Sequence, residues 1–236
     1  MQDAYVGDIG DYGKYGMLRQ VINAGLELGV NWYKVNPTKQ GKQNDGRFIE
    51  YLSIPERYKH YDPELFDQLI KVVIIDQDRE ISRIEEQGIL DSLFYSEPLK
   101  GGRAAWHNKA LETLVGADIV FLDPDNGLET ERMNRENKAT EKHVRWDEVR
   151  DYYDRGQSLI IYQHLPQHTK KEQCIEQLVT FGDEILNSDE VWILEFPRYT
   201  TRFYAFYLRE EHCDKASTVF DQMEKYWQGI CAIKRR

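Results

Sequence analysis

Side chains that could carry chemistry are concentrated in one short turn, Asp123-Pro124-Asp125-Asn126, which follows four apolar residues at 119–122. The apolar residues are mainly β-branched or aromatic, a composition that predicts a buried strand. The proline and the Asn-Gly pair that follow predict that this strand ends at Asp123. Because ligands of open α/β sheets bind at the carboxyl ends of the strands, we expect catalytic residues in this turn. An ordinary structural turn uses the same residue types, and that alternative stays open.

A second polar strand end is predicted at His164. Residues 158–162, SLIIY, are mainly apolar and predict a strand, and Gln163 and His164 follow directly. If both strands belong to one parallel sheet, His164 arrives at the same edge as Asp123 and is a further catalytic candidate. The alternative is a histidine that only makes a structural hydrogen bond.

The opening of the chain combines glycines with charged residues, and we expect it to bind a ligand. Gly7, Asp8, Asp11 and Lys14 stand in a segment with four glycines between positions 7 and 16. Glycine at this density allows a close approach of backbone to ligand. Asp11 is a predicted helix N-cap, which places Lys14 on the first turn of that helix. The alternative is a frayed terminal turn with solvated charges.

The elements that must position these residues alternate between strand and helix patterns. Strands are predicted at 30–35, 72–75, 93–95, 119–122, 158–162, 191–196 and 200–208. The last two are too close for a parallel crossover and therefore form a hairpin. We predict a single α/β domain over 1–236, a doubly wound, mostly parallel seven-stranded sheet with a C-terminal antiparallel hairpin. Residues 130–142 lack periodicity and are predicted to form a mobile lid, with a solvated surface excursion as the alternative. The basic tail 234–236 is predicted to be solvated.

Composition narrows the classes of function. A net charge of −10 and a pI near 5.2 argue against a large non-specific nucleic-acid surface. Three cysteines without a CxxC spacing predict reduced thiols in a cytoplasmic protein. No apolar run reaches transmembrane length, so no membrane contact is expected.

Two of these motifs resemble those of known enzymes. The layout and the Asp123-Pro124-Asp125-Asn126 turn resemble class I S-adenosylmethionine-dependent methyltransferases, whose fourth strand ends in D/N-P-P-Y. The opening Gly7-Asp8-x-x-Asp11-x-x-Lys14 is similar to the G-N-x-x-D-x-x-K segment of the ribosomal-RNA adenine-N6 methyltransferases. Similar openings also occur in uncharacterised bacterial proteins.

The resemblance implies a Rossmann-like methyltransferase fold, S-adenosylmethionine as cofactor and an amino group, such as that of a nucleic-acid base, as target. It implies that Asp123 and Pro124 accept hydrogen bonds from the target amine, and that Asp11 and Lys14 hold cofactor or substrate. Asp76, after the second predicted strand, stands where the family binds the cofactor ribose. Asn36 begins the loop that takes the place of the family's glycine-rich loop, and Tyr162 is a candidate to stack on a base.

Two other functions fit the same residues. Asp123 and Asp125 at i, i+2 could share Mg²⁺ or Mn²⁺ with a phosphate substrate, with Asn126 and His164 as helpers, in a metal-dependent transferase or hydrolase of nucleotides. The absence of the glycine-rich loop instead favours a non-catalytic relative that binds a nucleotide or a protein. The partner is therefore predicted to be a nucleic acid or a small molecule, and the choice stays open.

Overall fold

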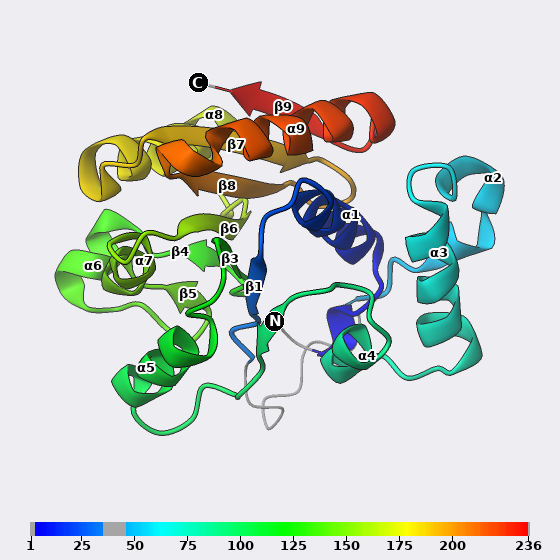
Figure 1. Ribbon diagram of the computed structural model, residues 1–236, viewed down its shortest axis with the longest axis horizontal. Coiled ribbons are helices and arrows are strands. Elements are labelled where there is room, and N and C mark those ends of the chain that lie inside the picture. The colour runs from blue at the N-terminus through cyan, green and yellow to red at the C-terminus, as the bar shows by residue number, and fades with distance from the viewer. Residues whose placement is uncertain (1–2, 35–45, 236) are drawn as a thin grey trace.

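The computed structural model describes residues 3–34 and 46–235, and a seven-stranded mixed sheet lies at the centre of this part of the chain (Figure 1). The strands lie in the order β2-β1-β3-β6-β8-β7-β9. Their bounds are β1 Leu28–Asn31, β2 Leu93–Tyr95, β3 Ile119–Leu122, β6 Ser158–His164, β7 Glu190–Phe196, β8 Arg202–Leu208 and β9 Ala232–Arg235. Two further strands pair only with each other, β4 Gly127–Leu128 and β5 His143–Val144.

Helices cover both faces of the sheet (Figure 1). They are α1 Ile9–Asn23, α2 Pro55–Tyr58, α3 Pro63–Ile70, α4 Ile81–Glu86, α5 Arg103–Thr113, α6 Glu131–Glu136, α7 Trp146–Tyr153, α8 Lys171–Thr180 and α9 Glu210–Tyr226. Short 3-10 turns lie at Asp3–Tyr5 and Glu50–Ser53, and π-helical turns at Lys71–Ile75 and Phe181–Leu186 extend α3 and α8. None of the helices in the described part of the chain is long and apolar enough to cross a membrane.

Two hydrophobic clusters form the core, one on each face of the sheet. The first joins the sheet to α1, α3, α4 and α9, and the second joins it to α5, α7 and α8. Strand β3 shows the division, because Phe121 packs in the first cluster whereas Val120 and Leu122 pack in the second. A strand that is buried on both faces needs apolar residues at every position, which explains its continuous apolar sequence.

The pairing pattern is mostly parallel on one side of the sheet and antiparallel on the other. Strands β2, β1, β3 and β6 are parallel neighbours. Strand β8 then runs antiparallel between β6 and β7, and β9 runs antiparallel to β7. The predicted α/β class, the mostly parallel core and the β7–β8 hairpin are therefore confirmed.

The predicted strand at 72–75 is wrong. These residues belong to the π-helical turn Lys71–Ile75, which continues α3. Leu69 and Val72 are buried, whereas Ile75 is 68% exposed, so the apolar residues follow the spacing of the helix. A run of four β-branched residues adopts a helical conformation here because it extends an amphipathic helix already docked on the core.

The C-terminal end and the first strand also differ from prediction. Residues 232–235, which overlap the tail predicted to be solvated, form β9 and pair with β7 at the edge of the sheet. The first strand spans 28–31 rather than 30–35. The sheet therefore contains seven strands, as predicted, but the predicted strand at 72–75 is absent and β9 takes its place in the count.

Candidate active site

Helix α1 carries the glycine- and aspartate-rich opening of the chain in a buried position. Asp8 is its N-cap, and the Asp8 side chain accepts a hydrogen bond from the backbone N–H of Asp11 at 2.8 Å. Asp11, the predicted N-cap, therefore lies inside the first turn. All helical residues from 9 to 18 are buried. The charged side chains of this segment are thus held in the protein interior, and the alternative of a frayed turn is wrong.

Lys14 is the centre of a buried charge network that joins two motifs distant in the sequence. Its Nζ lies 2.8 Å from Asp11 Oδ1 and 2.9 Å from Asp123 Oδ2, and its side chain is 4% exposed. The same Nζ lies 5.1 Å from the ring centroid of Tyr15 and 5.5 Å from that of Trp32. Burial alone would lower the pKa of Lys14, but the two carboxylates outweigh it and raise this pKa, so the lysine remains charged.

The carboxylate of Asp11 is held by donors from three directions. Its Oδ2 accepts hydrogen bonds from the Tyr15 hydroxyl at 2.7 Å and from the Gly7 backbone N–H at 3.2 Å, and its Oδ1 faces Lys14. Gly7 has a φ of +74°, and a Cβ there would lie 2.3 Å from a methyl group of Val73. Gly7 therefore takes part through its backbone, in a conformation that favours glycine.

Asp123 lies at the point where the order of the sheet changes direction. From β1 the chain adds β2 on one side and then returns to add β3 on the other. The backbone N–H of Asp123 donates to the carbonyl of Asn31 at 3.0 Å, so the end of β3 remains bound to the end of β1. Ligands of open α/β sheets bind at such a switch point. Burial raises the pKa of Asp123, and the charge of Lys14 opposes this rise.

The turn after Asp123 is held in place by an ion pair and by hydrogen bonds to neighbouring elements. Asp125 Oδ2 lies 3.3 Å from Lys142 Nζ. From β6, the Gln163 side chain accepts a hydrogen bond from the Leu128 N–H at 3.0 Å and donates to the Asn126 carbonyl at 3.1 Å. These contacts fix the backbone that presents the polar side chains of the turn.

Strand β8 forms the opposite wall of the site through Arg202 and Tyr204. Arg202 Nη2 donates to Thr200 Oγ1 at 2.9 Å, and Nη1 lies 3.7 Å from Asp8 Oδ1. A Cβ at Gly10 would lie 0.8 Å from Arg202 Nη1. The absence of a side chain at Gly10 is therefore what allows the guanidinium to rest against α1.

These walls enclose a cavity of about 330 Å³, a volume at the lower end of the range typical of small-molecule sites. It is lined by nine of the residues predicted from the sequence, namely Asp8, Asp11, Lys14, Asp123, Pro124, Asp125, Asn126, Tyr162 and His164. It is also lined by residues that sequence reasoning missed, namely Tyr5, Phe48, Lys142, Thr200, Arg202 and Tyr204. Segments from both ends and the middle of the chain therefore contribute to one cavity.

The remaining predicted residues do not line this cavity. Gly7 is not among the lining residues, but its backbone N–H donates to Asp11, which lines the cavity. Asp76 caps the helical turn after α3 and is exposed, because no strand precedes it. Asn36 lies outside the described residues. His164 does line the cavity, where burial and the nearby charge of Arg202 lower its pKa and favour the neutral imidazole.

One of the missed residues could have been found from the sequence. Arg202 is the first residue of β8, and it pairs in register with His164, the last residue of β6. In an antiparallel hairpin, the strand that follows the turn begins at the edge where the preceding strand ends. Charged residues at the start of the second strand therefore belong at the ligand-binding edge. The cavity role of Tyr5 and Phe48 has no comparable signal in the sequence.

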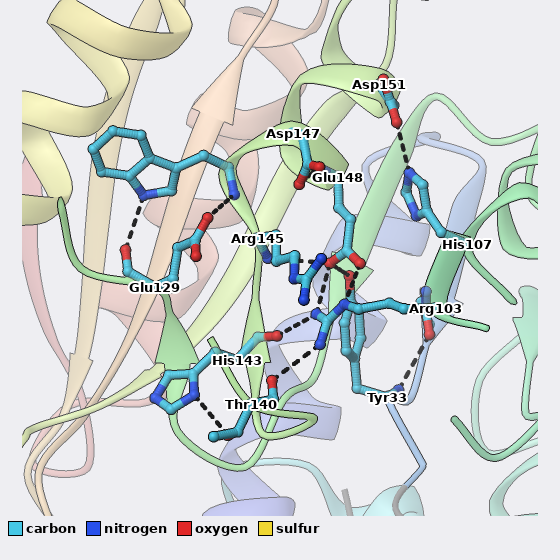
Figure 2. Close-up of polar contacts among 12 residues, drawn as sticks. Tyr33, Arg103, His107, Glu129, Thr140, His143, Arg145, Asp147, Glu148 and Asp151 are labelled. Carbon is cyan, nitrogen blue, oxygen red and sulfur yellow. Dashed lines mark hydrogen bonds and ion pairs between the residues drawn. The ribbon is translucent and has the colours of Figure 1, made fainter. Parts of the chain in front are cut away.

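A second network anchors the end of the segment 130–142, which was predicted to form a lid. Figure 2 shows Arg103 of α5 between Glu148 of α7 and the backbone of Thr140 and His143, at the start of β5. Arg103 Nε lies 2.5 Å from Glu148 Oε1, Nη1 donates to the Thr140 carbonyl at 3.0 Å, and Nη2 donates to the His143 carbonyl at 2.5 Å. Burial would raise the pKa of Glu148, but Arg103 outweighs it and the pKa is lowered. The lid itself stays a prediction.

The carboxylates of the turn face lysines. Asp123 pairs with Lys14 and Asp125 pairs with Lys142. Among residues 3–34 and 46–235, no group of three or more histidine, cysteine, aspartate or glutamate side chains is arranged to hold a metal ion.

Comparison with known proteins identifies a fold relative and no family. No family model matches the chain, and no curated protein matches it. A solved structure of a Legionella pneumophila protein, assigned to the family model DUF519, superposes with a TM-score of 0.51 at 12% identity. The match covers 98% of this chain and 97% of that one. At this identity the likeness shows a shared fold across nearly the whole length of both chains.

Proposed function

We propose that this chain is an S-adenosylmethionine-dependent methyltransferase that acts on an amino group. The observation that carries the proposal is the ion pair of 2.9 Å between Lys14 and Asp123. It joins the two segments that resemble methyltransferase motifs inside one cavity, at the switch point of the sheet. The antiparallel strand β8 between β6 and β7 also fits the layout of class I methyltransferases.

The cavity lining fits the chemistry of this cofactor. S-adenosylmethionine supplies a methyl group on a positively charged sulfur atom, attached to an adenosine. The carboxylates of Asp8 and Asp11 would favour the positive charge, and the rings of Tyr5, Phe48 and Tyr162 offer apolar faces to a purine. The acidic residue after the second strand is Glu97 rather than Asp76; it is exposed and pairs with Lys109 at 3.3 Å.

The chemistry assigned to Asp123 follows from its surroundings. Its carboxylate and the Pro124 carbonyl would accept hydrogen bonds from the N–H groups of the target amine and orient its lone pair toward the methyl group. Lys14 fixes the carboxylate in place through a buried ion pair. Because burial raises the pKa of Asp123, this residue is suited to accept the proton that the amine loses on methylation.

The metal-dependent alternative is less well supported. It requires Asp123 and Asp125 to share a cation, whereas each of them faces its own lysine. Metal binding would have to displace Lys14 from two carboxylates within 2.9 Å. The geometry therefore favours methyl transfer over metal-assisted chemistry.

Thermal unfolding with S-adenosylhomocysteine tests the proposal. At a concentration 100 times the dissociation constant, binding adds about 2.7 kcal/mol to the free energy of unfolding, and EDTA should not change this shift. Stabilisation by Mn²⁺ with a nucleotide, but not by S-adenosylhomocysteine, would select the metal-dependent alternative. Absence of both shifts would select the non-catalytic relative.

Methyl transfer provides the second test. Incubation with tritiated S-adenosylmethionine and separate RNA, DNA and small-molecule fractions should label one fraction. The Asp123→Asn variant should lose this labelling while it keeps the fold. The matched control is Asp214→Asn, which changes an exposed aspartate on α9. Equal labelling by the wild type and the Asp123→Asn variant would contradict the role assigned to Asp123.

A further inference from the structure

Among the positively charged residues that line the cavity, Arg202 has the most distant carboxylate partner, because Lys14 and Lys142 have carboxylates at 2.9 Å or less and at 3.3 Å. The Arg202 side chain is 11% exposed, and Asp8, the carboxylate with which it pairs, lies 3.7 Å away. Its other contact, with the Thr200 hydroxyl, brings no charge. A buried guanidinium needs both hydrogen-bond acceptors and negative charge around it.

The carboxylate of Asp8 also serves as the N-cap of α1. Its Oδ1, the atom closest to Arg202, accepts the N-cap hydrogen bond from the Asp11 N–H at 2.8 Å. Burial and the nearby charge of Asp11 raise the pKa of Asp8, so its negative charge is less well maintained than that of an exposed aspartate. Within the described part of the chain, the charge of Arg202 is therefore only partly neutralised.

Two buried polar atoms on the same wall have no hydrogen-bond partner within the described residues. They are Arg202 Nε and the hydroxyl of Tyr204, whose side chain is fully buried. Both residues line the cavity, two positions apart on β8. Because an unsatisfied buried donor costs about 1–3 kcal/mol, such atoms beside a cavity indicate a ligand that supplies the acceptors.

We propose that Arg202, together with Thr200 and Tyr204, forms a subsite for one anionic group, a carboxylate or a phosphate, of a small molecule bound in the cavity. The planar guanidinium presents donors in the geometry that both anions match. The inference rests on the proposed function in one respect, because it places the anion in the cavity that holds the methyl donor and the target amine. The anion would lie against the wall formed by β8, and the amine against the Asp123 turn.

Binding measured by calorimetry tests the subsite with four probes: S-adenosylhomocysteine, 5′-methylthioadenosine, inorganic phosphate and sulfate. 5′-Methylthioadenosine keeps the adenosine and the thioether sulfur of S-adenosylhomocysteine but lacks its whole aminocarboxypropyl group, the carboxylate included. The Arg202→Gln variant should bind the anionic probe about ten- to a hundredfold more weakly, the loss expected for a charge-assisted hydrogen bond. Arg202→Lys, which keeps the charge, should retain part of the affinity.

Arg209, at the other end of β8 from Arg202, provides a matched control. Arg209 follows β8 directly, and its Nε is also buried without a hydrogen-bond partner among the described residues, but it packs on the Tyr153 ring at 4.6 Å and does not line the cavity. Arg209→Gln should bind every probe as the wild type does. Circular dichroism of each variant establishes that the fold is kept.

Each outcome distinguishes a source of the anion or overturns the subsite. If Arg202→Gln weakens S-adenosylhomocysteine but not 5′-methylthioadenosine, the subsite holds the cofactor carboxylate. If it weakens phosphate and sulfate only, the subsite holds a phosphate of the methyl acceptor. Phosphate binding that depends on Arg202, without any binding of S-adenosylhomocysteine, would keep the subsite and reject the methyltransferase. Equal affinities in the wild type and Arg202→Gln, or no binding of any anion by the wild type, would overturn the subsite.

Discussion

Lys14 and Arg202 border the same cavity, and the protein compensates their positive charges to different degrees. Lys14 lies within 2.9 Å of two carboxylates, whereas Arg202 has one carboxylate at 3.7 Å and a buried Nε without a partner in the described chain. The first charge is neutralised by the fold, so its main effect is to fix Asp123. The second charge is left partly uncompensated, as expected for a group that awaits a ligand.

Arg103 is an arginine of the same molecule whose guanidinium has several acceptors and a close carboxylate. Its guanidinium donates to both oxygens of Glu148 and to two backbone carbonyls (Figure 2). It joins α5 to α7 and to the backbone of Thr140 and His143, and among residues 3–34 and 46–235 no comparable set of acceptors surrounds Arg202. The difference between the two arginines supports a ligand-binding role for Arg202 and a structural role for Arg103.

The largest loss of stability should come from removing the positive charge of Lys14. Lys14→Met leaves two buried carboxylates without their cation, which should lower the free energy of unfolding by about 3–5 kcal/mol. Urea denaturation measures this loss. The double variant Lys14→Met/Asp123→Asn should recover part of it, because one of the unpaired charges is removed. A loss below about 1 kcal/mol for Lys14→Met would show that the network is not structural.

The next largest loss of stability should come from removing the carboxylate that pairs with Arg103, and this loss should depend on pH. Glu148→Gln removes the buried partner of Arg103 and should cost about 3 kcal/mol at neutral pH. Because the folded-state pKa of Glu148 is lowered, its contribution is present above the ordinary glutamate pKa of about 4.3 and is lost as the pH falls through the folded value. Denaturation at several pH values should therefore show the stability gap between wild type and variant narrowing in acid. A gap that widens in acid would contradict the direction of this shift.

Removing the charge of Arg202 should change the stability of the protein less. Arg202→Gln should change the free energy of unfolding by no more than about 1 kcal/mol, because the weak pairing lost is offset by relief of a buried charge. The same urea experiment gives the value. If Arg202→Gln destabilised the protein as much as Lys14→Met, the contrast between the two cations would not hold.

The smallest effect on stability should come from Gly10→Ala. Alanine is favoured over glycine in a helix by about 1 kcal/mol, but the added Cβ would collide with Arg202 Nη1 and displace the guanidinium. We expect little change in Tm together with weaker binding of the anionic probe. Gly102→Ala is the control, since a Cβ there meets no atom within 4 Å. Unchanged anion binding by Gly10→Ala would indicate that the position of the guanidinium is not important.

Local sequence patterns predict the elements of the site correctly where an apolar strand pattern is followed at once by a turn signal, and less well elsewhere. The apolar run 119–122 and the Asp-Pro turn after it identified β3 and the switch point, because a doubly buried strand that stops at proline has few alternatives. The similar run 72–75 was misassigned, since only its continuity with α3 shows that it is helical. The ion pair of Lys14 with Asp123 depends on tertiary packing between positions 109 residues apart, which no local pattern contains.

That separation also has a consequence for synthesis on the ribosome. Lys14 emerges long before Asp123, and Arg202 emerges later still, so α1 must wait for its charge partners while most of the chain is translated. At about 5–20 residues per second the wait for Asp123 alone lasts several seconds to tens of seconds. During that time α3 and β1 are already available to α1, whereas β6, β7, β8 and α9, which pack in the same hydrophobic cluster, have not yet been made. The packing of α1 is therefore completed only when the last third of the chain, with β8 and α9, has been made.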